Sequence, residues 1–117
     1  MAAPLPKKRS KGTALPAAVP TVVYQCPTNF TAQMVLLVVS NKGSGNKTVT
    51  INWTDSHAGA SYSIVAGYVI SAYSFLKFDQ SYLVLNAGDS MTITSEAGSS
   101  MDVTVTVEEF FDPASRA

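Results

Sequence analysis

The side chains that most often carry catalysis are scarce in this sequence of 117 residues. It contains one histidine, His57, and one cysteine, Cys26. A nucleophile needs a base, and the base needs a group that orients it, but neither residue has an obvious ally. His57 lies in a polar turn and is expected to face solvent, while Cys26 at a strand end is expected to be a buried, inert thiol. We therefore expect a protein that is not an enzyme.

Residues that bind metals are equally dispersed. A zinc site needs several cysteine or histidine ligands, and a calcium site needs clustered carboxylates. The aspartates instead fall one to a turn or strand, at Asp55, Asp79, Asp89 and Asp102. Glu108 and Glu109 are neighbours and point to opposite faces of a strand, so they do not form the carboxylate pair of a glycoside hydrolase. We expect no metal and no cofactor.

The strongest local signal is a cluster of positive charge formed by Lys7, Lys8, Arg9 and Lys11. No acidic residue precedes Asp55, so residues 21–117 carry four cations against eight acids, a formal charge of 4 − 8 = −4. Four of the six prolines fall within residues 1–20, where they remove N–H donors and fix φ, which predicts an extended arm. This separation of charge, with a positive arm and a negative domain, suits a domain that rests on one surface while its arm reaches another.

The basic arm could contact nucleic acid, an acidic protein surface or a membrane. Its four cations have no interleaved aromatic side chains, so the pattern does not favour nucleic acid, and an acidic protein surface would serve the same charges. No long apolar run follows the arm, so a secretory signal is not expected. The longest apolar run, Met34–Val39, is too short to cross a bilayer as a helix. We favour docking to a protein and expect no membrane contact.

From Thr21 onward, apolar and polar residues alternate with a period of two, which predicts β-strands. The predicted strands are residues 21–25, 31–40, 47–54, 62–65 running into 67–70, 74–77, 81–85, 90–94 and 101–108. The strand 47–54 alternates most cleanly, with Trp53 as the expected core anchor. The strand 31–40 is apolar on both faces, with Met34, Leu36 and Val38 on one and Val35, Leu37 and Val39 on the other. That pattern predicts a central or covered strand.

Short strands separated by turns about every dozen residues predict an all-β fold, an antiparallel β-sandwich of Ig-like or jelly-roll-like type with an extended N-terminal arm. The expected organisation is an arm at residues 1–20, a sandwich domain at 21–109 and a C-terminal tail at 110–117. In that tail, Phe110 and Phe111 either fold back onto the core or dock on a neighbour. The residues predicted to dock on partners are Lys7, Lys8, Arg9, Lys11, Phe110 and Phe111.

Four stretches carry a resemblance to a known group of proteins. They are Val38 to Asn41, Val49 to Trp53, Ser81 to Leu85, and Ala87 to Ile93, where a Gly-Asp turn opens the penultimate hairpin. From about Thr21 to Glu109, this pattern resembles small β-sandwich structural proteins of tailed bacteriophage virions. The resemblance implies a protein without an active site that decorates the head, closes the neck or builds the tail as a symmetric homo-oligomer.

The same resemblance implies the partners and the location. The partners would be other virion proteins, of the capsid, the portal and neck or the tail, with flexible N-terminal arms reaching neighbouring subunits. The location would be the virion, assembled in the cytoplasm of a bacterial host. Repeated contacts in a shell can be individually weak because avidity multiplies them.

The alternative function is a carbohydrate- or receptor-binding adhesin module. Four tyrosines could act as stacking platforms for sugars, namely Tyr62, Tyr68, Tyr73 and Tyr82. Tyrosines in sheets more often pack against the core than bind ligands, which favours the structural role over the adhesin.

Overall fold

The computed structural model describes residues 5–79, 83–96, 98 and 100–113, which form an all-β fold. In chain order the strands are β1 (Lys7–Leu15), β2 (Thr21–Gln25), β3 (Phe30–Asn41), β4 (Lys47–Asp55), β5 (Ala60–Ile70), β6 (Phe75–Phe78), β7 (Val84–Leu85), β8 (Ser90–Ser95) and β9 (Met101–Phe111). The same residues contain no helical segment that could span a bilayer.

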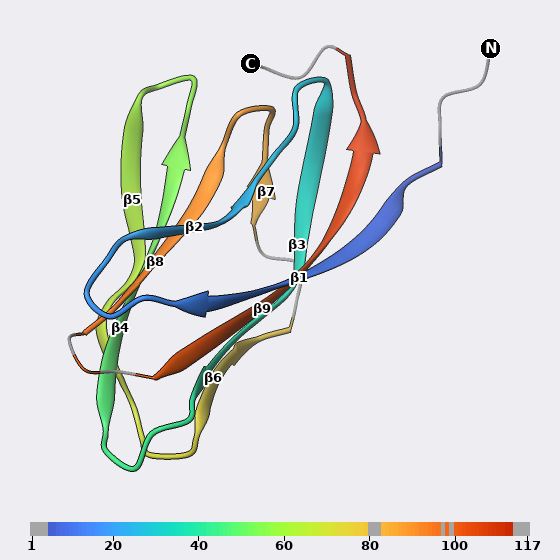
Figure 1. The fold of residues 1–117 in the computed structure, drawn as a ribbon. Coiled ribbons are helices and arrows are strands. Elements are labelled where there is room, and N and C mark those ends of the chain that lie inside the picture. The colour runs from blue at the N-terminus through green and yellow to red at the C-terminus, as the bar shows by residue number, and fades with distance from the viewer. Residues whose placement is uncertain (1–4, 80–82, 97, 99, 114–117) are drawn as a thin grey trace.

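The strands form two antiparallel sheets that pack face to face, which confirms the predicted sandwich (Figure 1). Sheet A has the order β1-β9-β3-β6, and β7 also pairs with β3; sheet B has the order β2-β8-β4-β5. Strands β1 and β2 contact each other across the sandwich, so they mark one side of it, and β5 and β6 mark the other. Consecutive strands therefore often belong to different sheets, and the chain repeatedly crosses between them.

The core lies between the sheets and follows the predicted alternation. Val103, Val105 and Val107 of β9 are each at most 2% exposed. Trp53 lies on β4 between β8 and the edge strand β5, is only partly buried, and stacks on Tyr62 of β5 with ring centroids 5.7 Å apart. It packs on the core as predicted but does not form its centre.

Strand β3 is central in sheet A, between β9 and β6, as its two apolar faces predicted. A register shift between Met34 and Leu36 alters which side chains share a face. This β-bulge sets two residues of β3 against one of β9, so the alternation changes phase. Met34, Leu37 and Val39 are therefore the fully buried residues, in place of either predicted set.

The N-terminal segment is extended, as predicted, but part of it belongs to the sandwich. Residues 7–15 form β1, an edge strand of sheet A that pairs with β9 from Lys7 opposite Glu109 to Leu15 opposite Met101. The prolines at positions 6 and 16 bracket a run of nine residues without proline, and each of these keeps the N–H that a ladder needs. The expected boundary at residue 20 therefore does not separate an arm from the sheet.

The C-terminal aromatics also lie within the sheet rather than beyond it. Strand β9 continues to Phe111, with Phe110 opposite Thr31 and Phe111 opposite Phe30. Because β3 begins as early as Phe30, the end of β9 still has a partner for its backbone groups. The tail predicted from residue 110 therefore begins at 112 at the earliest.

Two further strands differ from their predicted limits. Strand β5 is continuous from Ala60 to Ile70, because Gly67 at φ +62° allows the chain to pass an irregular register without breaking. Of the predicted strand 81–85, Val84 and Leu85 form β7, while residues 81 and 82 lie outside the described residues.

Candidate docking surface

The register between β1 and β9 sorts the basic residues of β1 between two faces. The residues that lie opposite are Glu109 for Lys7, Val107 for Arg9 and Val105 for Lys11. Residues directly opposite in an antiparallel pair point to the same face, and the two valines are buried between the sheets. Lys7, Arg9 and Lys11 thus project from the inner face of sheet A. Lys8 lies opposite Glu108 and projects from the outer face.

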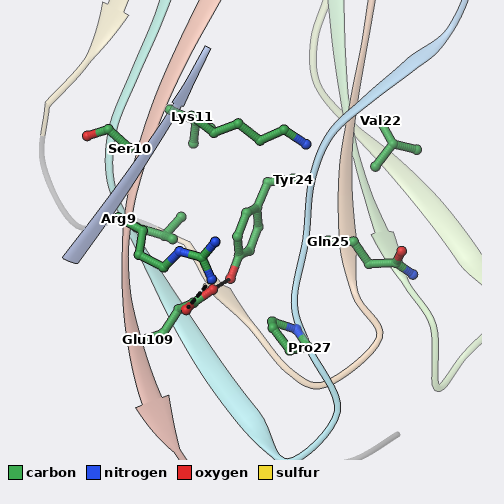
Figure 2. A pocket seen from close by; sticks show the side chains of 10 residues that line it. Arg9, Ser10, Lys11, Val22, Tyr24, Gln25, Pro27 and Glu109 are labelled. Atoms are coloured by element: carbon green, nitrogen blue, oxygen red, sulfur yellow. Dashed lines mark hydrogen bonds and ion pairs between the residues drawn. The ribbon is translucent and has the colours of Figure 1, made fainter. Parts of the chain in front are cut away.

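A cavity of about 450 Å³ opens where the inner face of β1 meets the edge of sheet B. Arg9 and Lys11 enter it from β1, Tyr24 from β2 and Glu109 from β9 (Figure 2). Val105 and Val107 complete the wall from β9. Ser10, the residue between the two cations, turns away from Tyr24 in the same view. The cavity therefore combines cationic walls with one carboxylate.

Glu109 is the central polar group of this cavity. Its side chain is 7% exposed, and its two oxygens have different partners. The Tyr24 hydroxyl donates to Oε2 at 2.5 Å, and Arg9 Nη1 donates to Oε1 at 3.3 Å. A buried carboxylate is costly unless it is hydrogen-bonded and paired, and here both conditions are met. The group therefore ties β1, β2 and β9 together at one point.

The phenol of Tyr24 is locked in its protonated form. Burial, followed by the hydrogen bond to Glu109, raises the pKa of Tyr24 well above its usual range. A protonated phenol is the form that can donate to a carboxylate. Tyr24 is thus a permanent donor to Glu109 across the neutral pH range.

The cations retain capacity for another partner. Arg9 is 66% exposed, and a guanidinium has five N–H donors, of which the bond to Glu109 uses one. Within the described part of the chain, no ion pair involves Lys7 or Lys11. Three cations against one carboxylate leave an excess of two positive charges. The surface can therefore accept an anionic group.

A second cavity, of about 520 Å³, adjoins the first and shares Arg9 and Glu109 with it. Its apolar wall is formed by Leu5, Phe30 and Phe111. The two phenylalanine rings meet edge to face, with centroids 5.6 Å apart. Leu5 is 84% exposed and Phe111 is 41% exposed, so apolar area remains open to solvent.

The two cavities form one continuous surface, which we call the β1–β9 surface. It comprises Leu5, Lys7, Arg9, Lys11, Phe30 and Phe111, with Tyr24 and Glu109 as its floor. Apolar area beside excess positive charge fits a protein segment that carries both a carboxylate and an apolar side chain.

The structure divides the six residues that the sequence predicted to dock. Lys7, Arg9, Lys11 and Phe111 lie together on the β1–β9 surface. Lys8 and Phe110 alternate with them along their strands and point to the other face of sheet A. A docking role for any of the six stays a prediction.

Sequence reasoning did not find Leu5, Tyr24, Phe30 or Glu109. One of them had a local signal: the period of two that buries Val105 and Val107 continues to Glu109 and Phe111. Tyr24 and Phe30 had none, because their place depends on how the two sheets face each other. The sequence does not indicate which residues the packing of the two sheets brings together, and the positions of Tyr24 and Phe30 depend on that packing.

His57 lines neither cavity of this surface, whereas Cys26 lies beside it, in contact with Phe30 and Tyr24. His57 is exposed in the turn after β4, and its backbone N–H donates to Asp55 Oδ1 at 3.0 Å. Cys26 is 2% exposed and donates to the carbonyl oxygen of Phe30 at 3.3 Å. Burial raises the pKa of the Cys26 thiol to about 11, so it stays protonated at neutral pH. Among the described residues, no cluster of three His, Cys, Asp or Glu could hold a metal ion.

The tyrosines that the adhesin alternative requires belong to the opposite side of the sandwich. Tyr62 and Tyr68 on β5 are 53% and 49% exposed, and Tyr73, between β5 and β6, is 74% exposed. Tyr62 stacks on Trp53. Tyr82 lies outside the described residues. None of the three described tyrosines lines either cavity of the β1–β9 surface.

Comparisons with known proteins identify similar folds only. No family model matches the chain, and no curated protein matches it. A solved structure described as "Bacillus endospore appendages form a novel family of disulfide-linked pili" is 15% identical, with a TM-score of 0.57 over 92% of this chain and 88% of that chain. Another, "Cyanophage Pam1 capsid asymmetric unit", is 12% identical, with a TM-score of 0.42 over 95% and 92%. The first similarity shows a shared fold, and the second is too low to argue from.

Proposed function

We propose that the protein is a non-enzymatic structural subunit of a bacteriophage virion, which assembles as repeated copies on the capsid or at the neck or tail. The observation that carries the proposal is the β1–β9 surface, where Lys7, Arg9 and Lys11 border the open apolar cavity of Phe30 and Phe111. The sequence pattern that resembles virion β-sandwich proteins supports the choice of particle.

The chemistry of the surface describes the segment that it would bind. Exposed ion pairs contribute about 0.2–1 kcal/mol each, so the cations alone give weak and salt-sensitive binding. Burial of Leu5 and the open part of Phe111 adds an apolar contribution that salt does not screen. A contact of this kind is weak for one copy and effective in an array, where many copies bind together.

The test compares two pairs of charge-removing substitutions. Lys7→Gln with Lys11→Gln removes two cations from the β1–β9 surface and leaves the Arg9–Glu109 pair in place. The control, Lys8→Gln with Lys47→Gln, removes the same charge from the outer face and from β4. We expect the first pair to lower occupancy in purified particles several-fold, with a larger loss in high-salt washes, and the control to stay near wild type.

Normal occupancy of the Lys7→Gln/Lys11→Gln variant would contradict docking through this surface. Deletion of residues 1–20 is a poor substitute for this test. It removes β1 and exposes β9, so a loss of occupancy would reflect a damaged sheet as well as a lost contact.

A second candidate function is the adhesin, and one observation favours it. Tyr62 and Tyr68 leave about half of their surface open on the edge strand β5, and the rings of Tyr62 and Trp53 stack. A glycan array with wild type and a Tyr62→Ala/Tyr68→Ala variant separates the two functions. Binding that the variant loses would support the adhesin, whereas the structural subunit should bind no glycan.

A further inference from the structure

Strand β1 is weakly anchored to its own domain. Of its nine residues, seven are exposed, Thr13 is half-buried and only Leu15 is buried. Its side-chain interactions with β9 are the Arg9–Glu109 pair and a hydrogen bond of 2.7 Å between the hydroxyls of Ser10 and Thr106. Apolar burial is the main force that keeps a strand in place, and β1 contributes little of it. The strand is therefore held mostly by its backbone ladder.

The segment that joins β1 to β2 resembles a hinge. Residues 16–20 are all exposed and carry the chain from sheet A to sheet B. Ala18 has φ +59°, in the left-handed region that a Cβ disfavours, so the turn is strained. Two hydrogen bonds tie the turn to β8: Ala18 N–H to Ser95 O at 2.9 Å, and Ser95 Oγ to Pro16 O at 3.4 Å. An extended hinge would release the strain.

Strand β9 specifies which strand it accepts. Without β1, its backbone groups form a free sheet edge, which is a template for pairing. Glu108 and Glu109 lie near one end of β9, opposite Lys8 and Lys7. An added strand thus gains the Arg9–Glu109 ion pair, and places Lys7 and Lys8 opposite the two glutamates, only when it runs antiparallel with its basic end at this position. The chain itself encodes such a strand, so a second copy can supply it.

We propose that β1 is exchanged between copies, so that β1 of one molecule pairs with β9 of the next in the register that it holds within one chain. The inference rests on the proposed assembly in repeated copies, and it names a second copy of this chain as the partner. The β1–β9 surface would then be built from two molecules, with Lys7, Arg9 and Lys11 from one and Glu109 and Phe111 from the other.

Exchange re-forms every contact between β1 and β9, so the two arrangements differ mainly in the hinge. The closed arrangement keeps the strained turn at Ala18, and the exchanged arrangement replaces it with an open hinge. A short, strained hinge favours exchange. The high local concentration of copies in an array favours it further, because the incoming strand is always close.

A disulfide across the exchanged pair provides the test. Ser10 and Thr106 are directly opposite, and their hydroxyl oxygens are 2.7 Å apart. Ser10→Cys and Thr106→Cys are placed in separate full-length chains with different affinity tags, co-expressed, purified and oxidised at pH 8. Cys26 is retained, since its buried thiol does not compete at that pH.

The expected product is a covalent dimer that carries both tags and that reducing agent separates. A matched control replaces Thr106→Cys with Ser63→Cys, an exposed position on β5 in the other sheet, and sets the background for chance cross-linking. The exchange is overturned if the two-tag dimer does not exceed that background. It is equally overturned if a chain with both Ser10→Cys and Thr106→Cys gives only monomer with an internal disulfide.

Two hinge variants provide an independent measure. Ala18→Gly removes the penalty at φ +59° and should lower the fraction of two-tag dimer several-fold. Deletion of residues 17–19 leaves a hinge too short to turn back and should raise that fraction. A dimer fraction that neither variant changes overturns the exchange.

The outcome is separable from that of the proposed function. Particles with normal occupancy but no two-tag dimer would overturn the exchange alone and leave the virion role in place. A two-tag dimer in a protein that never enters particles would support the exchange and overturn the virion role.

Discussion

The two sides of this sandwich end in very different edge strands. On one side, β1 carries four cations in nine residues and buries only Leu15. On the other side, β5 carries no charged residue, follows an irregular register with β4 and packs Ile64, Val65 and Ile70 on the core. Charge and bulges both protect a sheet edge from indiscriminate pairing. Each edge strand has one buried residue, but β5 adds Ile64 and Val65 as partly buried apolar side chains, so β1 depends more on its backbone pairing than β5 does.

The largest expected effect comes from removing the buried side chain at the end of the edge strand β5. Ile70 is 2% exposed at the end of β5, so Ile70→Ala should lower the free energy of unfolding by about 2–5 kcal/mol. Leu15→Ala provides the comparison at β1. It should speed amide hydrogen exchange in residues 7–15 well before the rest of the domain opens. Equal exchange in β1 and the core of the Leu15→Ala variant would show that both edges are fixed.

The next largest effect should come from high pH, which lowers the free energy of unfolding by ionising the Tyr24 and Cys26 side chains that are buried in the folded protein. The Cys26 thiol has an ordinary pKa of 9.0 when unfolded and about 11 when folded, and the pKa of Tyr24 is also raised. Raised values stabilise the fold below the unfolded pKa, and this contribution is lost as pH rises through the folded pKa. Chemical denaturation should therefore show the free energy of unfolding falling from pH 9 to 11. A Cys26→Ala/Tyr24→Phe variant should fall less steeply, and an equal slope would contradict the assignment.

A smaller effect tests the polar floor of the β1–β9 surface. Tyr24→Phe removes the donor to Glu109 Oε2 and leaves a buried carboxylate with Arg9 alone. We expect a loss of about 1–3 kcal/mol in the free energy of unfolding. Tyr62→Phe on the exposed face of β5 is the matched control and should change it by under about 0.5 kcal/mol. Similar losses at the two tyrosines would mean that Glu109 does not depend on Tyr24.

The smallest expected effect comes from a comparison of two residues with positive φ, one on each side of the sandwich. Gly67 on β5 has φ +62° with open space around it, so Gly67→Ala adds backbone strain without a clash and should cost about 1 kcal/mol. Ala18 in the hinge already has that strain, so Ala18→Gly should leave stability unchanged or raise it by a few tenths of a kcal/mol. Thermal unfolding of both variants measures the difference. A clear loss at Ala18→Gly would argue against a strained hinge.

The parts of the fold that sequence predicted are those with local causes. The burial of Val103, Val105 and Val107 follows from the alternation of β9 itself. The turn residues between Asn41 and Asn46 correctly predicted a loop but wrongly predicted a hairpin, because β3 and β4 belong to different sheets and do not pair. The phase change after Met34 was not predictable, because the bulge depends on how β3 pairs with β9.

The positive charges of the candidate site were evident from the composition, but their arrangement in space was not. The charge of Lys7, Arg9 and Lys11 was evident, but Glu109, the partner of Arg9, lies 100 residues away in the chain. A pattern of period two does not indicate which strand lies beside which. The sequence therefore predicted a separate arm where the structure has an edge strand.

The position of β9 has a consequence for synthesis. Of the strands described, it is the last to leave the ribosome, yet it lies between β1 and β3 in the middle of sheet A. Until β9 emerges, β1 has no partner in its own chain and the centre of one sheet is missing. Folding must then wait until translation of the strands is finished, and such distant pairing is slow. A nascent chain at that stage therefore carries a basic strand that still lacks the partner it has in the finished sheet.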